Sequence, residues 1–350
     1  MRAFLLGLAI AGVLLLANAA FVGSFGSALA LPPYLLQIVC LAGINVILAV
    51  SLNLINGFTG QFSIGHAGFM AIGAYAASYF TVTFGGRLRE AVGFLPEFGR
   101  ESLVLLVGLS IGALLAAVAG FLVGVPSLRL RGDYLAIVTL GFGEIFRVVL
   151  QQTKDVIFTA DEVARTSAPA LATHLGGALG FTGIPFYTTL FWAYLAAGIL
   201  LIVSFRLKRS SYGRALLSIR EDETAAEAMG IPTTRYKVQA FVLAAFFAGI
   251  AGALFAHLVG TTLNPRELGF QKSFDIVIMV VLGGMGSISG SALAAAILTI
   301  LPEVLRAVAE YRMIVYALAL ILMMIVRPQG LFGVHEIWDF FRRKPRAAGP

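Results

Sequence analysis

Long uninterrupted apolar runs recur along this 350-residue chain. A helix needs about 20 predominantly apolar residues to cross the hydrocarbon core of a bilayer, and many stretches approach that length. Hydrophobic residues make up 59% of the chain and charged residues 12%, against roughly 25% charged residues in soluble proteins. The runs are apolar on both faces, whereas a transmembrane β-barrel would show short alternating segments. The sequence therefore predicts an all-α, polytopic transmembrane helical bundle with broken or re-entrant helices.

Basic residues predict how the spans are oriented. The candidate spans cover approximately residues 3–22, 34–56, 66–84, 102–124, 133–151, 188–206, 238–258, a broken segment 272–303, and 312–327. Lysines and arginines crowd the loop 206–237 and the tail 341–350, which the positive-inside rule places in the cytoplasm. Alternation of the spans then requires 272–303 to enter and leave on the outer side. Either a re-entrant hairpin or two short spans would satisfy this requirement.

The N-terminus offers two interpretations. Arg2, an apolar run and the small residues Ala17 and Ala19 resemble a cleavable signal peptide. We favour an uncleaved first span, because polytopic proteins often use their first helix as the insertion signal. Every downstream orientation is the same under either interpretation.

The polar loop 206–237 contains the run Glu-Asp-Glu-Thr-Ala-Ala-Glu-Ala-Met-Gly-Ile-Pro, which begins at Glu221. Alanine, glutamate and methionine favour helix, Gly230 suits a helix C-terminus, and Pro232 lies just beyond it. The run predicts a short surface helix between two spans that could dock a partner. An ordinary solvated loop is the alternative, because charge runs usually only face water.

Two glycine-rich stretches interrupt the apolar pattern at predicted membrane depth. Irregular backbone there is tolerated only when it is buried in protein or lines a water-filled cavity, which points to a translocation path. Close packing of helices through small residues is the alternative, and both can hold together. The candidate residues are Gly57, Gly60, Gln61, Ser63, Gly65 and His66 in the first stretch, and Gly283, Gly284, Gly286 and Ser287 in the second.

The sequence predicts no catalytic constellation, no metal site and no cofactor. No Lys-Ser or Lys-Thr follows the glycine-rich stretches, so nucleotide hydrolysis must come from another chain. Cys40 is the single cysteine, and the histidines lack the spacing of metal ligands. Glu144 and Arg147 lie three residues apart on one predicted helix and are expected to form a structural pair. The chain is therefore not expected to be an enzyme.

The motifs of this chain resemble, over nearly its whole length, the LivM-type permease subunits of branched-chain amino acid ABC importers. They are Ser51-Leu52-Asn53-Leu54, the glycine-rich region 57–73, the stretch from Leu130 to Gly141, the loop from Gly213 to Gly230, Gly283-Gly284-Met285-Gly286-Ser287, and Arg327-Pro328-Gln329-Gly330-Leu331-Phe332-Gly333. Related permeases for urea or short amides share this appearance, so the motifs leave the substrate open.

The resemblance implies a division of labour between subunits. It implies a LivH-like second permease, two cytoplasmic ATPase subunits and an external or periplasmic solute-binding protein as partners, with a lipid bilayer around the chain and no nucleic acid. The implied location is the bacterial cytoplasmic (inner) membrane, with a cytoplasmic C-terminus. Loop 206–237 becomes the coupling loop of a single permease domain, 1–340, followed by the basic tail 341–350. The implied ATPase-coupling residues are Glu221, Asp222, Glu223, Ala225, Ala226, Glu227 and Gly230.

The coupling loop departs from the family pattern at one position. Importer permeases carry an acid followed by two alanines there, whereas Thr224 separates Glu223 from Ala225 in this chain.

The sequence leaves other classes of function open. A gradient-driven secondary transporter would need intramembrane acids or ion-site carbonyls, and a channel would need a ring of selective groups. A membrane enzyme would need a catalytic cluster that the sequence lacks. The favoured interpretation is an ATP-driven importer of branched-chain amino acids, working by alternating access.

Overall fold

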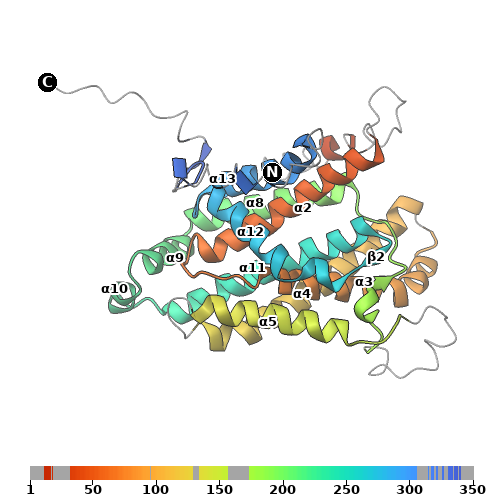
Figure 1. The fold of residues 1–350 in the computed structure, drawn as a ribbon, viewed down its shortest axis with the longest axis horizontal. Helices are drawn as coiled ribbons and strands as arrows, with labels where there is room; N and C mark the ends of the chain where they lie inside the picture. Colours follow the sequence, from red (N-terminus) through yellow and green to blue (C-terminus); the bar gives the residue numbers. More distant parts are fainter. Residues whose placement is uncertain are drawn as a thin grey trace.

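The described part of the chain is built almost entirely from α-helices (Figure 1). The computed structural model describes residues 32–94, 96–128, 134–156 and 173–305, with 12–16, 18, 314, 317–318, 321, 325–326, 330–333, 335–337 and 339. Within these ranges six helices are long and apolar enough to cross a membrane. They are α2 (Pro33–Asn56), α3 (His66–Ala91), α4 (Glu97–Ser127), α5 (Tyr134–Gln151), α8 (Leu190–Arg209) and α11 (Thr233–Val259). The predicted all-α polytopic bundle is confirmed.

Each of these helices contains most of one predicted span, and several extend beyond it. Helix α8 continues into the basic stretch to Arg209, and α11 already begins at Thr233. The apolar pattern marks only the part of a helix suited to the hydrocarbon core, whereas backbone hydrogen bonding continues into the polar flanks. The predicted spans 3–22 and 312–327 lie largely outside the described residues.

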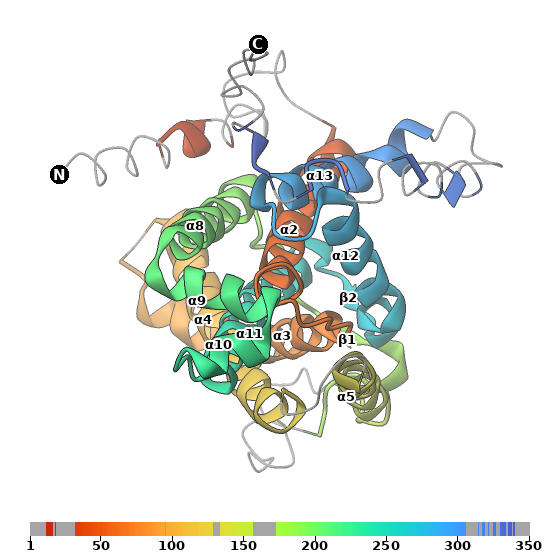
Figure 2. The same ribbon diagram turned by 90° about the vertical axis from the view of Figure 1, so that its left-hand side faces the viewer.

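Helix α11 packs against α2, α3 and α4 at the centre of the bundle, and α2 is also flanked by α8 and, on another side, by α12 (Phe270–Gly283) and α13 (Ile288–Val304) (Figure 2). The backbones of α3 and α11 nearly touch. A methyl group at Gly73 would come within 2.2 Å of the Gly249 carbonyl oxygen, and one at Gly252 within 1.9 Å of the Met70 carbonyl oxygen. Small residues therefore set the helix spacing, as is common in membrane bundles.

The predicted broken segment forms the two helices α12 and α13. Helix α13 runs antiparallel beside α2, since Thr299 hydrogen-bonds to Asn45 and Glu303 accepts from Tyr34 near the start of α2. Helix α12 begins about halfway along α2. The two helices are only about 21 and 26 Å long at 1.5 Å per residue. They are abbreviated antiparallel helices whose turn reaches one end of the bundle, not a hairpin that turns at mid-depth.

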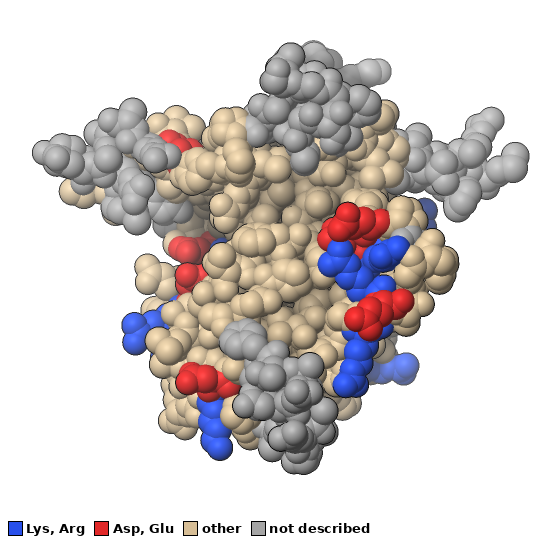
Figure 3. Space-filling view, turned by 90° about the vertical axis from the view of Figure 1, so that its right-hand side faces the viewer, with Lys and Arg blue, Asp and Glu red and all other residues tan. Residues whose placement is uncertain are grey.

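The two ends of the bundle differ. The short helices α9 (Ser211–Glu221) and α10 (Glu223–Ala228) lie at the left in Figure 1, which we call the α10 end. The opposite end, called the β1 end, carries the two-residue strands β1 (Phe181–Thr182) and β2 (Thr262–Leu263) and the 3-10 helices η1 (Gly177–Leu179) and η2 (Pro265–Leu268). Figure 3 faces the β1 end, where charged side chains form separate groups among neutral ones.

The predicted single surface helix over 221–230 is wrong in its bounds. Glu221 ends α9, and Asp222 has an extended backbone with φ −156°. The Asp222 carboxylate accepts a hydrogen bond from the Ala225 N–H at 3.0 Å and so caps α10. Aspartate favours such N-cap positions over helix interiors, because its side chain replaces the missing backbone acceptor. The run therefore forms one short helix, α10, which starts two residues later than predicted, and its first residue, Glu221, ends α9.

Candidate functional site

Helix α10 is held against the first turns of α11 by its acidic side chains. Glu223 Oε1 lies 2.5 Å from the ammonium nitrogen of Lys237, whose side chain is only 2% exposed. Thr233 Oγ1 donates to Glu227 Oε1 at 2.7 Å, and Ala226 is buried. A buried ammonium group needs a charged partner, so this ion pair fixes the position of α10 relative to α11.

The outer side of α10 is exposed. Ala225 and Ala228 face outward, and Met229 is 83% exposed just after the helix. Gly230 then takes a φ of +83°, a conformation that side chains rarely adopt, and lets the chain turn back into α11. A groove beside α10 is lined by residues of α4 and of the start of α11. The exposed residues of α10 thus form a small apolar surface, and the Glu223–Lys237 ion pair holds this helix in place. Such a surface is suited to docking against another protein.

Helices α9 and α10 contact each other, and we call the pair the α9–α10 hairpin. Arg220, in the last turn of α9, connects this hairpin to both glycine-rich breaks. One guanidinium nitrogen donates to the Gly57 carbonyl oxygen at 2.8 Å and makes a longer contact of 3.5 Å with that of Met285. Gly60, with φ +70°, lies against the same side chain, and a methyl group there would meet Arg220 Cγ at 3.1 Å. A displacement of α9 would therefore change the contacts of Arg220 with both breaks.

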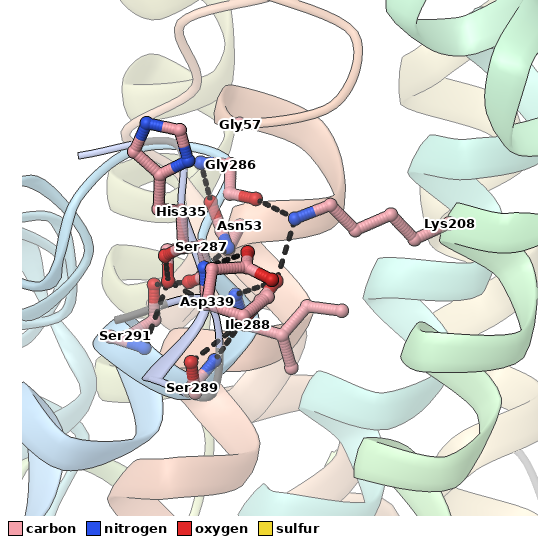
Figure 4. A network of polar contacts seen from close by, with 12 residues as sticks. Asn53, Gly57, Lys208, Gly286, Ser287, Ile288, Ser289, Ser291, His335 and Asp339 are labelled. Atoms are coloured by element: carbon pink, nitrogen blue, oxygen red, sulfur yellow. Dashed lines mark hydrogen bonds and ion pairs between the residues drawn. The ribbon is translucent and has the colours of Figure 1, made fainter. Parts of the chain in front are cut away.

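The two breaks lie side by side at the α10 end, and Asn53 joins them (Figure 4). Its Oδ1 accepts from the Gly286 N–H at 2.9 Å, and its Nδ2 donates to the Ser287 carbonyl oxygen at 3.0 Å. A methyl group at Gly57 would come within 2.5 Å of the Gly286 nitrogen. One amide side chain from α2 thus satisfies both backbone groups of the turn before α13, where helical partners are missing.

Glu336, in the segment after the last predicted span, contacts the same turn. Its carboxylate accepts from the backbone N–H groups of Ile288 and Ser289 at 3.2 and 3.0 Å, and from Lys208 Nζ at 2.6 Å. Lys208 also donates to the Gly286 carbonyl oxygen at 2.7 Å. Burial raises the pKa of Glu336, but the hydrogen bonds from Lys208 and Ser289 outweigh it and hold the pKa below its usual value.

Close contacts surround the other residues of the first break. Ser63 N donates to Asn56 Oδ1 at 3.1 Å, and a methyl group at Gly65 would lie 2.0 Å from the Thr139 carbonyl oxygen. The ring of His66 is buried, with Nε2 2.8 Å from Ser51 Oγ. Gln61 is partly exposed. Close packing accounts for Gly65 and His66, one of the two interpretations that the sequence left open.

The remaining glycines belong to the second break. Gly283 packs against Gly290, because a methyl group added at Gly283 would come within 2.5 Å of the Gly290 carbonyl group. Gly284 and Gly286 have φ values of +106° and +96°, which only glycine adopts readily. Ser287 caps α13 by accepting from the Gly290 N–H at 3.1 Å. The sharp turn and the close helix approach both require these small residues.

Comparison with known proteins decides the family. The sequence model of the family described as "Branched-chain amino acid transport system / permease component" matches residues 34–326. The chain belongs to this permease family. The permease is 38% identical over 304 residues to the high-affinity branched-chain amino acid transport system permease protein LivM of Salmonella typhimurium, covering 82% of this chain and 67% of that protein. The resemblance to LivM-type permeases is confirmed.

Two further relatives extend the comparison. LivM of Escherichia coli is 38% identical over 311 residues, which cover 84% of the permease and 69% of that protein. LivH of Escherichia coli, named as a permease protein of the same kind of system, is 34% identical over 140 residues, 39% of this chain and 45% of that protein. The shorter match to LivH indicates that the two kinds of permease share part of their fold.

Sequence reasoning missed four residues that organise this site in the permease. Asn53 appeared only within a family motif, and Lys208 and Arg220 only as part of the basic loop. Glu336 carried no signal, because its partners are distant in sequence and no local pattern marks a helix cap supplied from elsewhere. The expected pairing of Glu144 with Arg147 is confirmed at 2.7 Å.

Proposed function

We propose that this chain is one of the two permease subunits of an ATP-driven importer of branched-chain amino acids. The observation that carries the proposal is the α9–α10 hairpin, which exposes Met229 beside α10 and contacts both breaks through Arg220. The names of the LivM and LivH relatives supply the substrate class. The chemistry of ATP hydrolysis belongs to partner subunits.

The coupling mechanism follows from the connections of the hairpin. Two cytoplasmic ATPase subunits dock at the α10 end, one on the permease and one on a LivH-like second permease. ATP-driven closure of the ATPases displaces α10, and the Glu223–Lys237 ion pair passes the displacement to α11. Arg220 passes it to the backbone carbonyls of Gly57 and Met285. The helices then rock as rigid elements between outward-open and inward-open arrangements.

The permease spans a bacterial cytoplasmic (inner) membrane with its C-terminus in the cytoplasm, and a solute-binding protein delivers substrate at the β1 end. Residues 1–340 form one permease domain that contains the coupling loop 206–237, and 341–350 form a basic tail. The low share of charged residues, 12%, supports the membrane assignment.

Uptake measurements test the proposal. Cells that carry or lack the gene are supplied with labelled leucine or labelled urea, with the proton gradient collapsed and ATP maintained. Gene-dependent leucine uptake that survives the collapse is the expected result. Gene-dependent uptake of urea alone would retain the ATP-driven mechanism but make urea the substrate in place of branched-chain amino acids. Loss of all gene-dependent uptake on collapse would contradict an ATP-driven mechanism and favour a gradient-driven carrier.

The coupling role of the hairpin is tested at Gly230. Proline fixes φ near −65° and is incompatible with the observed +83°, so Gly230→Pro should disturb the end of α10. We expect leucine uptake to fall while the ATPases continue to hydrolyse ATP. Gly230→Asn is the matched control, because asparagine tolerates positive φ, and it should transport normally. Normal leucine uptake by Gly230→Pro, with as much variant as wild-type protein in the membrane, would contradict the coupling role of the hairpin.

A further inference from the structure

A groove follows the seam between α4 and α11 on the surface of the bundle. Three adjoining hollows of about 770, 470 and 210 Å³ make it up, and the widest is the one beside α10. Neighbouring hollows share lining residues: Phe121, Val238 and Gln239 belong to the first two, and Phe246 to the last two. The hollows therefore form one continuous depression, which we call the α4–α11 groove.

The α4–α11 groove extends through about half the thickness of a membrane. The predicted span of α11 begins at Val238, which lines the two wider hollows, and the narrowest hollow ends at Ile250. These two residues lie about 18 Å apart along the helix at 1.5 Å per residue, whereas the hydrocarbon core is about 30 Å thick. The groove thus has the depth of one leaflet, measured from the α10 end.

The wide end of the groove is polar. Four polar residues line it: Glu227, Thr234, Arg235 and Gln239. The Arg235 side chain is exposed and has no carboxylate oxygen within 4.0 Å in the described part of the chain. Glu227 Oε1 accepts from Thr233 at 2.7 Å, which leaves the second carboxylate oxygen available. A cation and an anion that can each bind a further group therefore lie at the membrane surface.

The rest of the groove is apolar and becomes narrower. Its walls are aliphatic and aromatic side chains, apart from Ser110, whose hydroxyl donates to the Leu106 carbonyl oxygen within its own helix. The hollow of about 210 Å³ is bounded by α8 as well as by α4 and α11. A helix with its side chains is about 10–12 Å across, which is wider than a hydrocarbon chain. The narrowing therefore suits an acyl chain better than the helix of a partner.

A phospholipid presents matching groups in the same order. Its phosphate suits a guanidinium group such as that of Arg235. The ammonium group of an ethanolamine headgroup can donate to Glu227, whereas a choline headgroup carries methyl groups in place of these donors. A headgroup that is only anionic would place a second negative charge beside Glu227. The pair of charges thus favours a zwitterionic ethanolamine headgroup.

We propose that the α4–α11 groove binds a phosphatidylethanolamine molecule of the leaflet at the α10 end. Arg235 binds its phosphate, Glu227 binds its ammonium group, and one acyl chain lies along Val242 and Phe246. Gly230 lines the same wide hollow, so the bound headgroup also contacts the end of α10. The site does not depend on which solute the permease carries.

Native mass spectrometry of the complete transporter, with its second permease and its ATPase subunits, tests the site. The complex in mild detergent is titrated with phosphatidylethanolamine and, separately, with phosphatidylcholine. Wild type should bind the ethanolamine lipid more tightly. Arg235→Gln should weaken that binding at least about tenfold, because it removes a charge-assisted hydrogen bond to phosphate. Arg206→Gln, an exposed basic residue on α8 outside the groove, is the matched control and should bind as wild type does.

The apolar part of the groove is tested by filling it. Val242→Trp places a large ring where the acyl chain lies, and Leu122→Trp adds the same ring to the 66% exposed side of α4, outside the groove. A ligand that binds only the folded state stabilises it. Added phosphatidylethanolamine should therefore raise the unfolding temperature of wild type and Leu122→Trp, but not that of Val242→Trp.

The other outcomes would overturn the site. Equal binding of the two lipids, unchanged in Arg235→Gln, would show that only non-specific boundary lipid is present. If Val242→Trp loses the second permease from the complex while Leu122→Trp keeps it, the groove is the interface with that subunit. Selective binding that depends on Arg235 would support the site even if cells import no leucine, so failure of this site and failure of the importer function are distinguishable.

Discussion

At the scale of single residues, Glu336 is the point where three parts of the chain meet. Its carboxylate joins the start of α13 to Lys208 at the end of α8, and its side chain is only 8% exposed. Hydrogen bonds to a charged acceptor are stronger than those to a neutral one. Glu336 therefore holds the segment that follows the last predicted span against the α12–α13 turn.

The contribution of Glu336 to stability depends on pH. Its folded-state pKa is lowered, so the stabilisation is complete above the unfolded pKa of about 4.3 and is lost as the pH falls through the folded value. Glu336→Gln should lower the free energy of unfolding by about 1–3 kcal/mol at neutral pH. Thermal unfolding of the detergent-solubilised protein between about pH 7 and 3 measures this.

The difference in unfolding temperature between wild type and Glu336→Gln should be large at neutral pH and shrink toward the acid end. Glu90→Gln is the control, because Glu90 is exposed on α3 and should show no such trend. A difference that stays constant across the range would show that the charge of Glu336 does not stabilise the turn.

At the scale of helices, the spacing of α3, α4 and α11 is set by glycines rather than by large side chains. Gly112 of α4 approaches the Gly73 carbonyl oxygen so closely that a methyl group would lie 2.6 Å away, and Gly249 similarly meets α4. Backbones that approach this closely gain van der Waals contact along their length, which is what drives helix association in lipid.

Gly73→Ala tests this packing. The added methyl group would lie 2.2 Å from the Gly249 carbonyl oxygen, so α3 and α11 must separate. We expect the free energy of unfolding to fall by about 1–3 kcal/mol, the usual cost of overpacking. Gly198→Ala is the matched control, because no atom lies within 4 Å of the added group on α8. Equal thermal unfolding of the two variants would contradict close packing at Gly73.

At the scale of the whole molecule, the two ends of the bundle are built differently. The α10 end carries the exposed hairpin, both breaks and the Glu336 contacts, while the β1 end carries the short strands and the connection between α3 and α4 (Figure 1). The positive-inside rule predicts from the basic residues of loop 206–237 that the α10 end faces the cytoplasm, as in the proposed function. Under the proposed function, ATPases dock at the α10 end and substrate arrives at the β1 end.

Labelling from outside the cell tests this orientation. Met229 and Phe94 are each 83% exposed and lie at the α10 end and in the α3–α4 connection. An impermeant thiol reagent should label Phe94→Cys in intact cells, and Met229→Cys only after the membrane is opened. Wild type supplies the background, since its single cysteine, Cys40, is buried. The reverse pattern would invert the molecule and remove the α10 end from the ATPases.

The sequence by itself determined the fold class, most of the spans, the break within 272–303 and the exposed polar loop. These features are local: apolar length, glycine content and charge are read from neighbouring residues. The same local patterns started the predicted surface helix at Glu221, because they do not reveal that the Asp222 carboxylate caps a new helix, α10. It also ended several helices early, where the apolar pattern stops.

Only the tertiary structure decided which distant residues meet. Asn53 and Ser287 are separated by 234 positions, and Lys208 and Glu336 by 128, yet each pair is hydrogen-bonded. The turn between α12 and α13 has backbone groups without helical partners, and burial requires that some side chain satisfy them. Which side chain does so depends on how the helices pack, and a single sequence contains no local pattern that specifies it.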